Sequence, residues 1–463
     1  MKTTRRDFLK TTGAAVTGAA LLSALPDEAR SEEAASAPSR PNILFLFPDE
    51  HRFDWLGSNP AIPIKTPNLD KLCARGVRFT RAFTPSPLCA PARACLSSGR
   101  EYDRCRVPAN SVNYPDDQMT FYKLLRESGY HTMGCGKFDL HKGAHDWGAD
   151  GKRKLDVWGF SDGIDSAGKG DGSAAARTGK PEPYTLFLKS RGLLETHLED
   201  FKKRRDGDGH GTFPTPLPDD AYDDNWIASN GLELIRRAPS GKPWFLQVNF
   251  TGPHPPWDIT ESMTKLYADV EFPQPNKGTG LTPERHNEIR RNYAAMITNI
   301  DRLCGLFIDE LAKRGELENT IVVYSSDHGE MLGDHGHWGK SVPFQPSVGV
   351  PLICAGPGAK AGLVSDALTT ITDIAATCLD YGGVPRPGDM DSLSLRPVIE
   401  GREKVHREAV FSALAKFRMT FDGRVKTIYG FRGERELKVF DLVEDPLENT
   451  DLVKQGEANV SNG

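Results

Sequence analysis

The sequence predicts an α/β fold, with a large, mostly parallel β-sheet between helices and a smaller antiparallel sheet near the C-terminus. Residues 42–47 form a continuous apolar run, as expected for a strand buried on both faces of a parallel sheet. Residues 242–250 and 320–325 predict further core strands, and residues 284–314 between them have the pattern of a long amphipathic helix. Residues 424–431 are strand-like and belong to a smaller C-terminal unit. Apolar strands that alternate with helices indicate a layered α/β protein.

Length and composition limit the class of protein. The chain has 463 residues, of which 38% are hydrophobic, so it can bury a large core as one domain with an appendage or as two domains. Its 58 Lys and Arg against 63 Asp and Glu give a net charge of −5, without a long basic run, so we expect no nucleic-acid partner. Eight cysteines without Cys-x-x-Cys spacing define neither a disulfide framework nor a zinc site.

The N-terminus has the pattern of an export signal. Arg5 and Arg6 precede a weakly apolar stretch at residues 11–25, as in twin-arginine signal peptides. This stretch is rich in Ala, Gly and Thr, and it is too short and too weakly apolar to span a bilayer. We therefore predict a signal peptide at residues 1–37, passage through the twin-arginine export machinery, and a periplasmic or secreted protein.

The remaining chain divides into two parts. Residues 38–400 are predicted to form the main domain, and residues 401–463 a small C-terminal subdomain. Within the main domain, residues 144–218 are rich in Gly, Asp and Lys and show little periodicity, so we expect a loop-rich insertion there. Loops above a rigid sheet often carry specificity.

Polar groups directly follow four predicted strands. They are Asp49 after residues 42–47, Lys137 after residues 130–135, His254 after residues 242–250, and Asp327 with His328 after residues 320–325. Open α/β sheets bind ligands at the carboxyl ends of their strands. These groups are therefore expected to meet at one edge of the sheet.

Cys89 is predicted to lie at the N-terminus of a helix. Pro91 is tolerated at a helix start, and the following run of good helix formers ends at Gly99. Unpaired N–H groups at a helix N-terminus favour a thiolate and can hold an oxyanion. Arg93, one turn further on, points back toward the same position.

Two motifs carry a resemblance to a known family. The spacing Cys-x-Pro-x-Arg from Cys89, followed by Leu-x-Ser-Gly-Arg, resembles type I sulfatases of the alkaline phosphatase superfamily. The Ser-Asp-His-Gly segment at residues 326–329 resembles the same family, and the similarity extends over residues 41–452. It implies an alkaline-phosphatase-like fold and an exported enzyme that hydrolyses a sulfate ester, on a small molecule or a carbohydrate. It also implies that a formylglycine-generating enzyme oxidises Cys89 to formylglycine, whose hydrate is the nucleophile.

The resemblance also implies a metal site. Its ligands would be Asp49, Asp327, His328 and an oxygen of the modified Cys89, a mostly hard set that suits Ca²⁺ or a similar divalent ion. Many sulfatases have a second Asp after the first, whereas this chain has the longer Glu50, which we leave out of the ligand set.

Further roles follow from the same resemblance. Arg93, Lys137 and Lys340 would offset charge on the sulfuryl oxygens. The family commonly has His two places after the lysine, where this chain has Asp139, so either His141 or His254 would protonate the leaving oxygen.

Three alternatives remain open at this stage. A phosphonate or phosphate diester hydrolase of the same superfamily could use the same residues. A two-zinc phosphatase is disfavoured because Cys89 holds the nucleophile position and a second His/Asp metal cluster is not evident. A non-catalytic sugar-binding protein would leave Cys89, the basic groups and the metal residues without a role.

Overall fold

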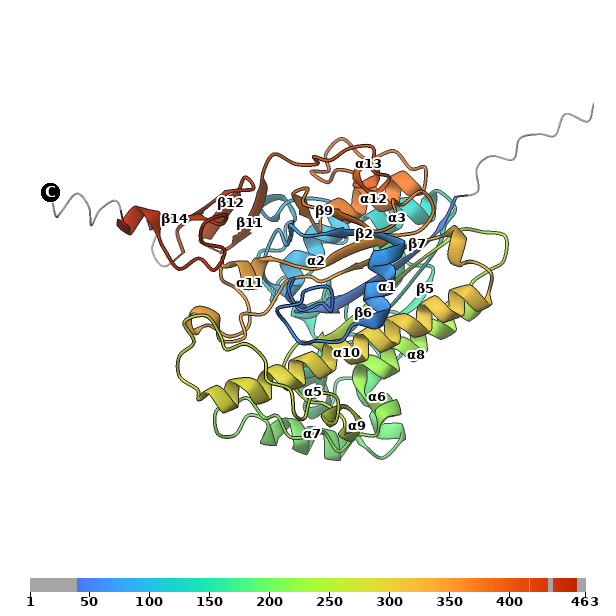
Figure 1. Cartoon of the computed structure of the whole chain (residues 1–463). Coiled ribbons are helices and arrows are strands. Elements are labelled where there is room, and N and C mark those ends of the chain that lie inside the picture. The colour runs from blue at the N-terminus through green and yellow to red at the C-terminus, as the bar shows by residue number, and fades with distance from the viewer. Residues whose placement is uncertain (1–39, 416, 432–435, 456–463) are drawn as a thin grey trace, which may run out of the picture. The chain divides into compact units, whose positions relative to one another are not determined.

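The computed structural model describes residues 40–415, 417–431 and 436–455, so the predicted export signal at residues 1–37 lies outside the described residues. An eight-stranded sheet forms the centre of the fold (Figure 1). Its strands, in spatial order, are β5 (Asp162–Asp165), β4 (His131–Gly136), β6 (Trp244–Pro253), β1 (Asn42–Asp49), β7 (Thr320–Ser325), β8 (Leu352–Ala355), β2 (Gly76–Phe79) and β9 (Leu363–Ser365).

Most neighbouring strands of this sheet are parallel. The first five in spatial order, β5 to β7, pair in parallel, whereas β8 runs antiparallel to both of its neighbours. The predicted α/β class with a mostly parallel sheet is confirmed. Because β1, β4, β6 and β7 are adjacent and parallel, their carboxyl ends lie along one edge, where the predicted polar groups follow them.

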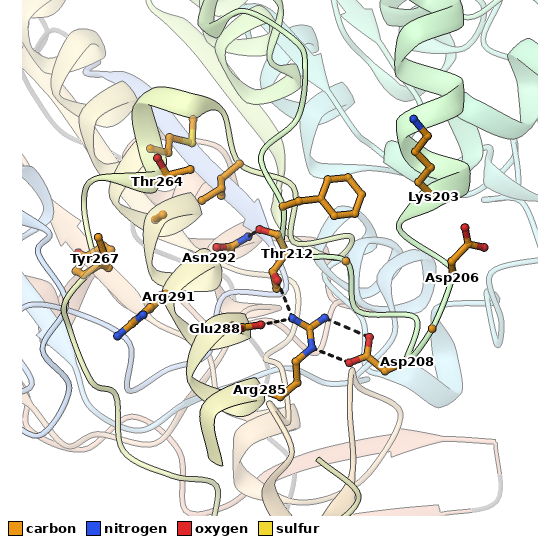
Figure 2. A pocket seen from close by; sticks show the side chains of 17 residues that line it. Lys203, Asp206, Asp208, Thr212, Thr264, Tyr267, Arg285, Glu288, Arg291 and Asn292 are labelled. Atoms are coloured by element: carbon orange, nitrogen blue, oxygen red, sulfur yellow. Dashed lines mark hydrogen bonds and ion pairs between the residues drawn. The ribbon is translucent and has the colours of Figure 1, made fainter. Parts of the chain in front are cut away.

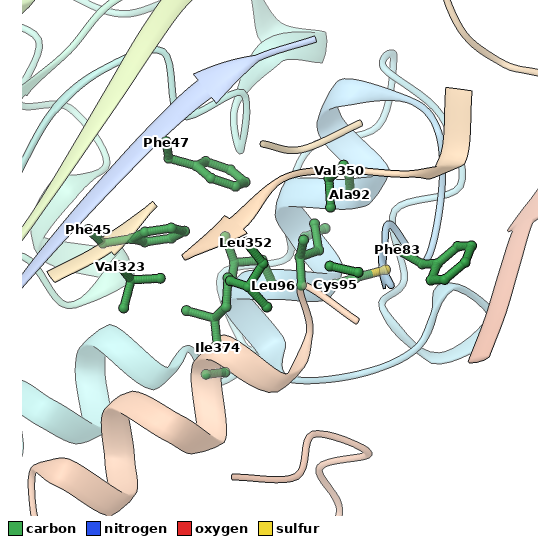
Figure 3. Packing of buried hydrophobic residues seen from close by; sticks show 14 of the residues in the cluster. Phe45, Phe47, Phe83, Ala92, Cys95, Leu96, Val323, Val350, Leu352 and Ile374 are labelled. Atoms are coloured by element: carbon green, nitrogen blue, oxygen red, sulfur yellow. The ribbon is translucent and has the colours of Figure 1, made fainter. Parts of the chain in front are cut away.

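Helices cover both faces of the sheet. One face packs against α2 (Cys89–Ser98), α3 (Phe121–Glu127) and α12 (Asp373–Tyr381), and the other against α1 (Pro67–Arg75), α8 (Asp223–Arg236) and α10 (Pro283–Lys313) (Figure 1). Side chains of β1 alternate between the two cores, since successive residues of a strand point to opposite faces. Figure 3 shows part of the first core, with Phe45, Val323 and Leu352 from the sheet beside Leu96 of α2 and Ile374 of α12.

The segment at residues 144–218 contains more regular structure than its composition predicts. It holds the edge strand β5 and the helices α4 (Leu155–Trp158), α5 (Lys169–Arg177), α6 (Pro183–Ser190) and α7 (Leu194–Lys203). These elements hold just under half of the segment, and the rest is loop, so the expected loop-rich insertion carries more helix than its composition indicated. Its elements are short, and several polar side chains are buried in pairs, as with Lys169 and Asp258 at 2.6 Å, so no apolar periodicity marks them.

The C-terminal part forms a separate four-stranded antiparallel sheet. Its strands pair in chain order: β11 (Val410–Leu414), β12 (Phe417–Phe421), β13 (Val425–Tyr429) and β14 (Leu437–Asp441). The predicted small antiparallel sheet is thus confirmed. Within this sheet, the buried Lys426 of β13 pairs with Glu448, its Nζ 2.6 Å from Glu448 Oε1.

The remaining short elements connect these layers. They are β3 (Ala82–Phe83), β10 (Thr369–Thr370), α9 (Glu261–Thr264), α11 (Gln345–Val348) and α13 (Arg396–Ile399). Across the described ranges, no helix combines the length and the apolar character needed to cross a membrane. None of the eight cysteines, all within the described ranges, is joined in a disulfide.

Candidate active site

Four predicted residues meet at the carboxyl edge of the sheet. Asp49 ends β1, Asp327 and His328 follow β7, and Cys89 is the first residue of α2. The Cys89 Sγ lies 3.3 Å from His328 Nε2 and 3.8 Å from Asp49 Oδ1. His328 Nε2 lies 3.7 Å from Asp327 Oδ2. All four side chains are buried, so this is a small, closed cluster around the nucleophile position.

The backbone fixes the orientation of the ligand-type groups. The His328 ring faces the Gly329 carbonyl with Nδ1 at 3.1 Å, so a proton on Nδ1 leaves Nε2 free toward Cys89 and the carboxylates. Asp327 Oδ1 accepts hydrogen bonds from the N–H groups of Glu50 and His328, each at 3.0 Å. These contacts hold both side chains in place before any ligand is bound.

Arg93 connects the two carboxylates of the cluster. Its guanidinium donates to Asp327 Oδ2 at 2.9 Å and to Asp49 Oδ2 at 3.1 Å. It also donates to the Lys137 carbonyl and to Asn249 Oδ1, so most of its donors are used within the protein. Arg93 was predicted to neutralise sulfuryl oxygens; its contacts in the structure position the carboxylates.

The donor set fits a divalent cation. One ligand atom from each of Asp49, Cys89, Asp327 and His328 lies within 4.8 Å of the others. Two carboxylates and an imidazole, together with an oxygen in place of the Cys89 sulfur, suit Ca²⁺ or Mg²⁺ better than a thiol-binding metal. Arg93 pairs with both carboxylates through their Oδ2 atoms, whereas Asp49 Oδ1 lies 3.9 Å from His328 Nε2 within the cluster of four.

Two lysines and a histidine surround this cluster. Lys137, at the end of β4, forms an ion pair with Asp49 and lies 3.1 Å from Asp139. Lys340 Nζ lies 2.7 Å from Glu50 Oε2. His254 Nε2 lies 3.4 Å from the same oxygen, while its Nδ1 is 2.6 Å from the Pro255 carbonyl. Glu50 is thus paired with Lys340 and His254, outside the cluster of four.

The electrostatics favour the thiolate form of an unmodified Cys89 and the charged form of Lys137. Burial would raise the pKa of the Cys89 thiol, but Lys137 and Lys340 hold it well below its ordinary value. Burial would lower the pKa of Lys137, but Asp139 and Asp49 raise it well above its ordinary value. Burial raises the pKa of Glu50 to about 7, although Lys340 opposes the shift.

Three non-glycine residues at the site have left-handed backbone conformations. They are Glu50 (φ 69°), Asp139 (φ 55°) and Ser341 (φ 73°). Such conformations cost energy for residues with a Cβ atom and are concentrated at functional sites. Each of them redirects the chain directly after a strand or beside Lys340.

The structure does not bring His141 into the cluster. Burial, followed by Lys154, lowers the pKa of the His141 ring, and no hydrogen bond or ion pair joins this ring to the residues around Cys89 in the described part of the chain. Asp139, not His141, contacts Lys137, and it also pairs with Lys142 at 2.9 Å. Sequence reasoning missed Lys142; its spacing of three residues from Asp139 was the available signal. It also missed Asp171, because its segment was expected to be a loop.

The larger cavities lie away from this cluster. One cavity of about 580 Å³ is lined by residues 203–213 and by the N-terminal part of α10. Figure 2 shows Arg285 there, paired with Asp208 and Glu288. None of the residues around Cys89 lines it, so cavity size alone would point to the wrong place.

Comparisons with known proteins agree with the geometry. The sulfatase family model matches residues 41–384, and a model described as the C-terminal part of N-sulphoglucosamine sulphohydrolase matches residues 333–461. The chain belongs to the sulfatase family. The resemblance predicted from the segments around Cys89 and Asp327 is therefore confirmed, and the protein is a sulfuric ester hydrolase by family. Membership implies a formylglycine made from cysteine and a divalent metal, with which the cluster around Cys89 is consistent.

Several relatives illustrate the range of this sulfatase's similarities. An arylsulfatase of Clostridium perfringens is 28% identical, covering 90% of this chain and 91% of the relative. An N-acetylglucosamine-6-O-sulfatase of Bacteroides thetaiotaomicron is 27% identical over an alignment that covers 90% of this chain and 83% of the relative. The crystal structure of a phosphonate monoester hydrolase of Agrobacterium radiobacter superimposes with a TM-score of 0.74 at 25% identity. The superposition covers 91% of this chain and 93% of the hydrolase.

Proposed function

We propose that this sulfatase hydrolyses a sulfate ester on a carbohydrate, with a formylglycine formed from Cys89 as the nucleophile. The observation that carries the proposal is the position of Cys89 at the start of α2, with its Sγ 3.3 Å from His328 Nε2 and 3.8 Å from Asp49 Oδ1. A nucleophile placed there lies beside the candidate metal ligands and near Lys137 and Lys340.

The residues divide the chemistry among them. Asp49, Asp327, His328 and the modified Cys89 would hold a divalent ion, which when bound lowers the pKa of a hydroxyl group beside it. Lys137 and Lys340 place two ammonium groups where charge on sulfuryl oxygens must be offset. Arg93 holds the carboxylates apart and in place.

His254 is the proposed proton donor to the leaving oxygen. Its Nδ1 faces the Pro255 carbonyl, so Nε2 is the nitrogen that faces Glu50 and the site. The His254 side chain is 29% exposed, which places it at the open side of an otherwise buried cluster. A leaving group that departs toward solvent passes this side.

Relatives support a carbohydrate substrate. One acts, by its name, on N-acetylglucosamine-6-O-sulfate, and a solved structure with the same fold is described in complex with a disulfated glucosamine. A second candidate function is hydrolysis of a phosphonate or phosphate ester, favoured by the close superposition on the phosphonate monoester hydrolase.

A substrate panel tests the proposed function. Purified protein co-expressed with a formylglycine-generating enzyme is assayed against an aryl sulfate, an aryl phosphate diester and an aryl phosphonate, and then against defined sulfated glycans. We expect the highest kcat/KM for sulfate esters and release of sulfate from at least one glycan. Preference for the phosphonate by a factor of 100 or so would favour the second candidate instead.

The modification is tested on the same preparation. Mass spectrometry of the peptide that contains Cys89 should show the aldehyde, and Cys89→Ala should reduce kcat by about four to six orders of magnitude. Cys73→Ala, which removes a half-buried thiol on α1, is the matched control and should retain full activity. Fully active protein with an alkylatable thiol at Cys89 would contradict the mechanism.

We further propose that the protein is exported in folded form by the twin-arginine route. The support is the Arg5-Arg6 pair ahead of a weakly apolar stretch. Residues 1–40 fused to a folded reporter should carry it out of the cytoplasm, and replacement of Arg5 and Arg6 by lysine should stop its export. Export that is unaffected by this replacement would refute the route.

A further inference from the structure

A chain of alternating charges leads from the Cys89 cluster toward the surface. Lys137 pairs with Asp49 and lies 3.1 Å from Asp139 Oδ2. Lys142 shares that oxygen at 2.9 Å, and its Nζ lies 3.0 Å from Asp171 Oδ2 on α5. One buried carboxylate oxygen therefore joins two ammonium groups, and a second carboxylate holds the outer one.

The turn between β5 and α5 is part of this arrangement. At Gly168, the residue before α5, an added Cβ would lie 2.6 Å from Lys137 Cε, so a larger residue there would displace the end of the Lys137 side chain. Three residues later, Asp171 pairs with Lys142. The segment at residues 144–218 thus contributes a wall to the active site.

The exposed fractions of the side chains rise from the inner lysine to the outer lysine and its second carboxylate, with Asp139 fully buried between the two lysines. They are 2% for Lys137, 12% for Lys142 and 26% for Asp171. Because the nucleophile is buried, the ester's leaving group must depart toward solvent, and Lys142 is the more exposed of the two lysines that share Asp139. Two of the three ammonium donors of Lys142 are used by carboxylates, which leaves one N–H for a substrate atom.

We propose that Lys142, held between Asp139 and Asp171, donates a hydrogen bond to the oxygen that bridges sulfur and the leaving group. This inference rests on the proposed function. As the S–O bond breaks, its electron pair passes to that oxygen, and Lys142 stabilises the charge without giving up its proton. Burial would lower the pKa of Lys142, but Asp139 raises it above its ordinary value, so the ammonium persists. Lys142 then offsets the charge on the leaving oxygen, and His254 supplies the proton that this oxygen takes up.

A leaving-group series tests the proposal. Aryl sulfates whose phenols span a wide pKa range are assayed with the formylglycine-containing enzyme and its Lys142→Met variant. Poor leaving groups need more stabilisation, so kcat/KM should fall about 100-fold for phenyl sulfate and less than about 10-fold for 4-nitrophenyl sulfate. Asp171→Asn removes one partner of Lys142 but leaves the Lys142 ammonium in place. Its loss of kcat/KM should be smaller than that of Lys142→Met and should likewise be larger for phenyl sulfate than for 4-nitrophenyl sulfate.

Controls separate this role from a merely structural one. Lys154→Met removes another lysine of the same region, paired with Asp116 at 2.7 Å, and should leave the whole series unchanged. An equal loss for every leaving group, or no loss at all, would overturn the proposal, since Lys142 would then only support its neighbours. Thermal unfolding of each variant shows whether the fold is retained, and Lys142→Arg should recover much of the graded loss.

A binding measurement keeps this inference distinct from the proposed function. Calorimetric titration of phenyl sulfate into Cys89→Ala protein needs no turnover, and adding Lys142→Met should weaken the affinity severalfold. An unchanged affinity together with an ungraded rate loss overturns the Lys142 contact. If the unaltered enzyme instead hydrolyses only phosphonates, the sulfate assignment fails, and the same series of aryl phosphonates decides the role of Lys142.

Discussion

Two buried charge networks in this protein use the same residue types in different ways. Around Asp373, at the start of α12, every carboxylate oxygen has partners. Arg407 and His406 bind Oδ2 at 2.8 and 3.0 Å, and backbone N–H groups of Thr370 and Leu393 donate to the two oxygens. Around Cys89, by contrast, Glu50 Oε1, Asp139 Oδ1 and Glu330 Oε2 are buried without a hydrogen-bond partner among the described residues.

The difference shows what separates a structural network from a functional one. A buried carboxylate that is fully hydrogen-bonded can join two segments, and Asp373 joins α12 to residues 406–407. A network with unpaired buried acceptors is stable only where something else completes it, such as a cation, a substrate or water. The first type should therefore report on stability when altered, and the second on ligand binding and activity.

The largest expected effect is at the open network. Asp327→Asn keeps the shape of the side chain but removes a charge from the candidate metal site. We expect metal content below about one tenth of the unaltered protein and kcat/KM reduced at least about 1000-fold, with the fold retained. Elemental analysis and aryl sulfate assays measure both. Asp380→Asn, a partly exposed carboxylate on α12, is the control; normal metal content in Asp327→Asn would place the metal elsewhere.

The closed network should give the opposite result. Asp373→Asn leaves the partly buried Arg407 without its charged partner, and removal of one member of a buried pair typically costs about 3 kcal/mol or more. We expect the free energy of unfolding to fall by about that amount, measured by urea denaturation, while kcat of the folded protein at low temperature stays within twofold. Lost activity with unchanged stability would show that the two networks are not distinct in this way.

Much of the fold could be predicted because its core strands are apolar on both faces. The run at residues 42–47 and the helix formers after Cys89 carry their structure in local pattern, and the structure places them as β1 and α2. β5 could not be found in this way. It is only four residues long, Asp-Gly-Ile-Asp, and it joins the sheet through pairing with β4, which is a long-range contact.

The site could be predicted only where residues lie at strand ends or in motifs. Asp49, Asp327 and His328 come at the carboxyl ends of strands that were expected to meet at one edge of the sheet, so the cluster was foreseeable. Lys142 and Asp171 lie 29 residues apart in the chain and meet only because α5 packs beside the end of β4. His141 was proposed because this chain has Asp139 where the family commonly has His two places after the lysine, and its role stays a prediction.

Acid should weaken the closed network through Asp373. Burial would raise the pKa of Asp373, but hydrogen bonds from Arg407 and His406 hold it below its ordinary value. A carboxylate with a depressed pKa contributes stability that is fully present above its unfolded pKa of about 3.9 and is lost as the pH falls through the folded value. The difference in unfolding free energy between unaltered protein and Asp373→Asn should therefore be constant from pH 7 to about pH 5 and shrink below about pH 4.

The measurement is a series of urea unfolding curves at fixed ionic strength. Other carboxylates also titrate in this range, but they are common to both proteins and largely cancel in the difference. A difference that grows on acidification would mean that Asp373 is not held ionised by its partners.

The smallest effect is expected at an exposed ion pair, which serves as the reference for the buried networks around Asp373 and Cys89. Arg75 and Glu318 lie 2.8 Å apart, with side chains 42% and 83% exposed. Water and salt screen such a pair, and its ordering costs side-chain entropy, so Glu318→Gln should change the free energy of unfolding by less than about 0.5 kcal/mol. Activity and metal content should be unchanged. If this variant lost as much stability as Asp373→Asn, burial would not be what distinguishes the Asp373 network, and the contrast with the open network around Cys89 would need another cause.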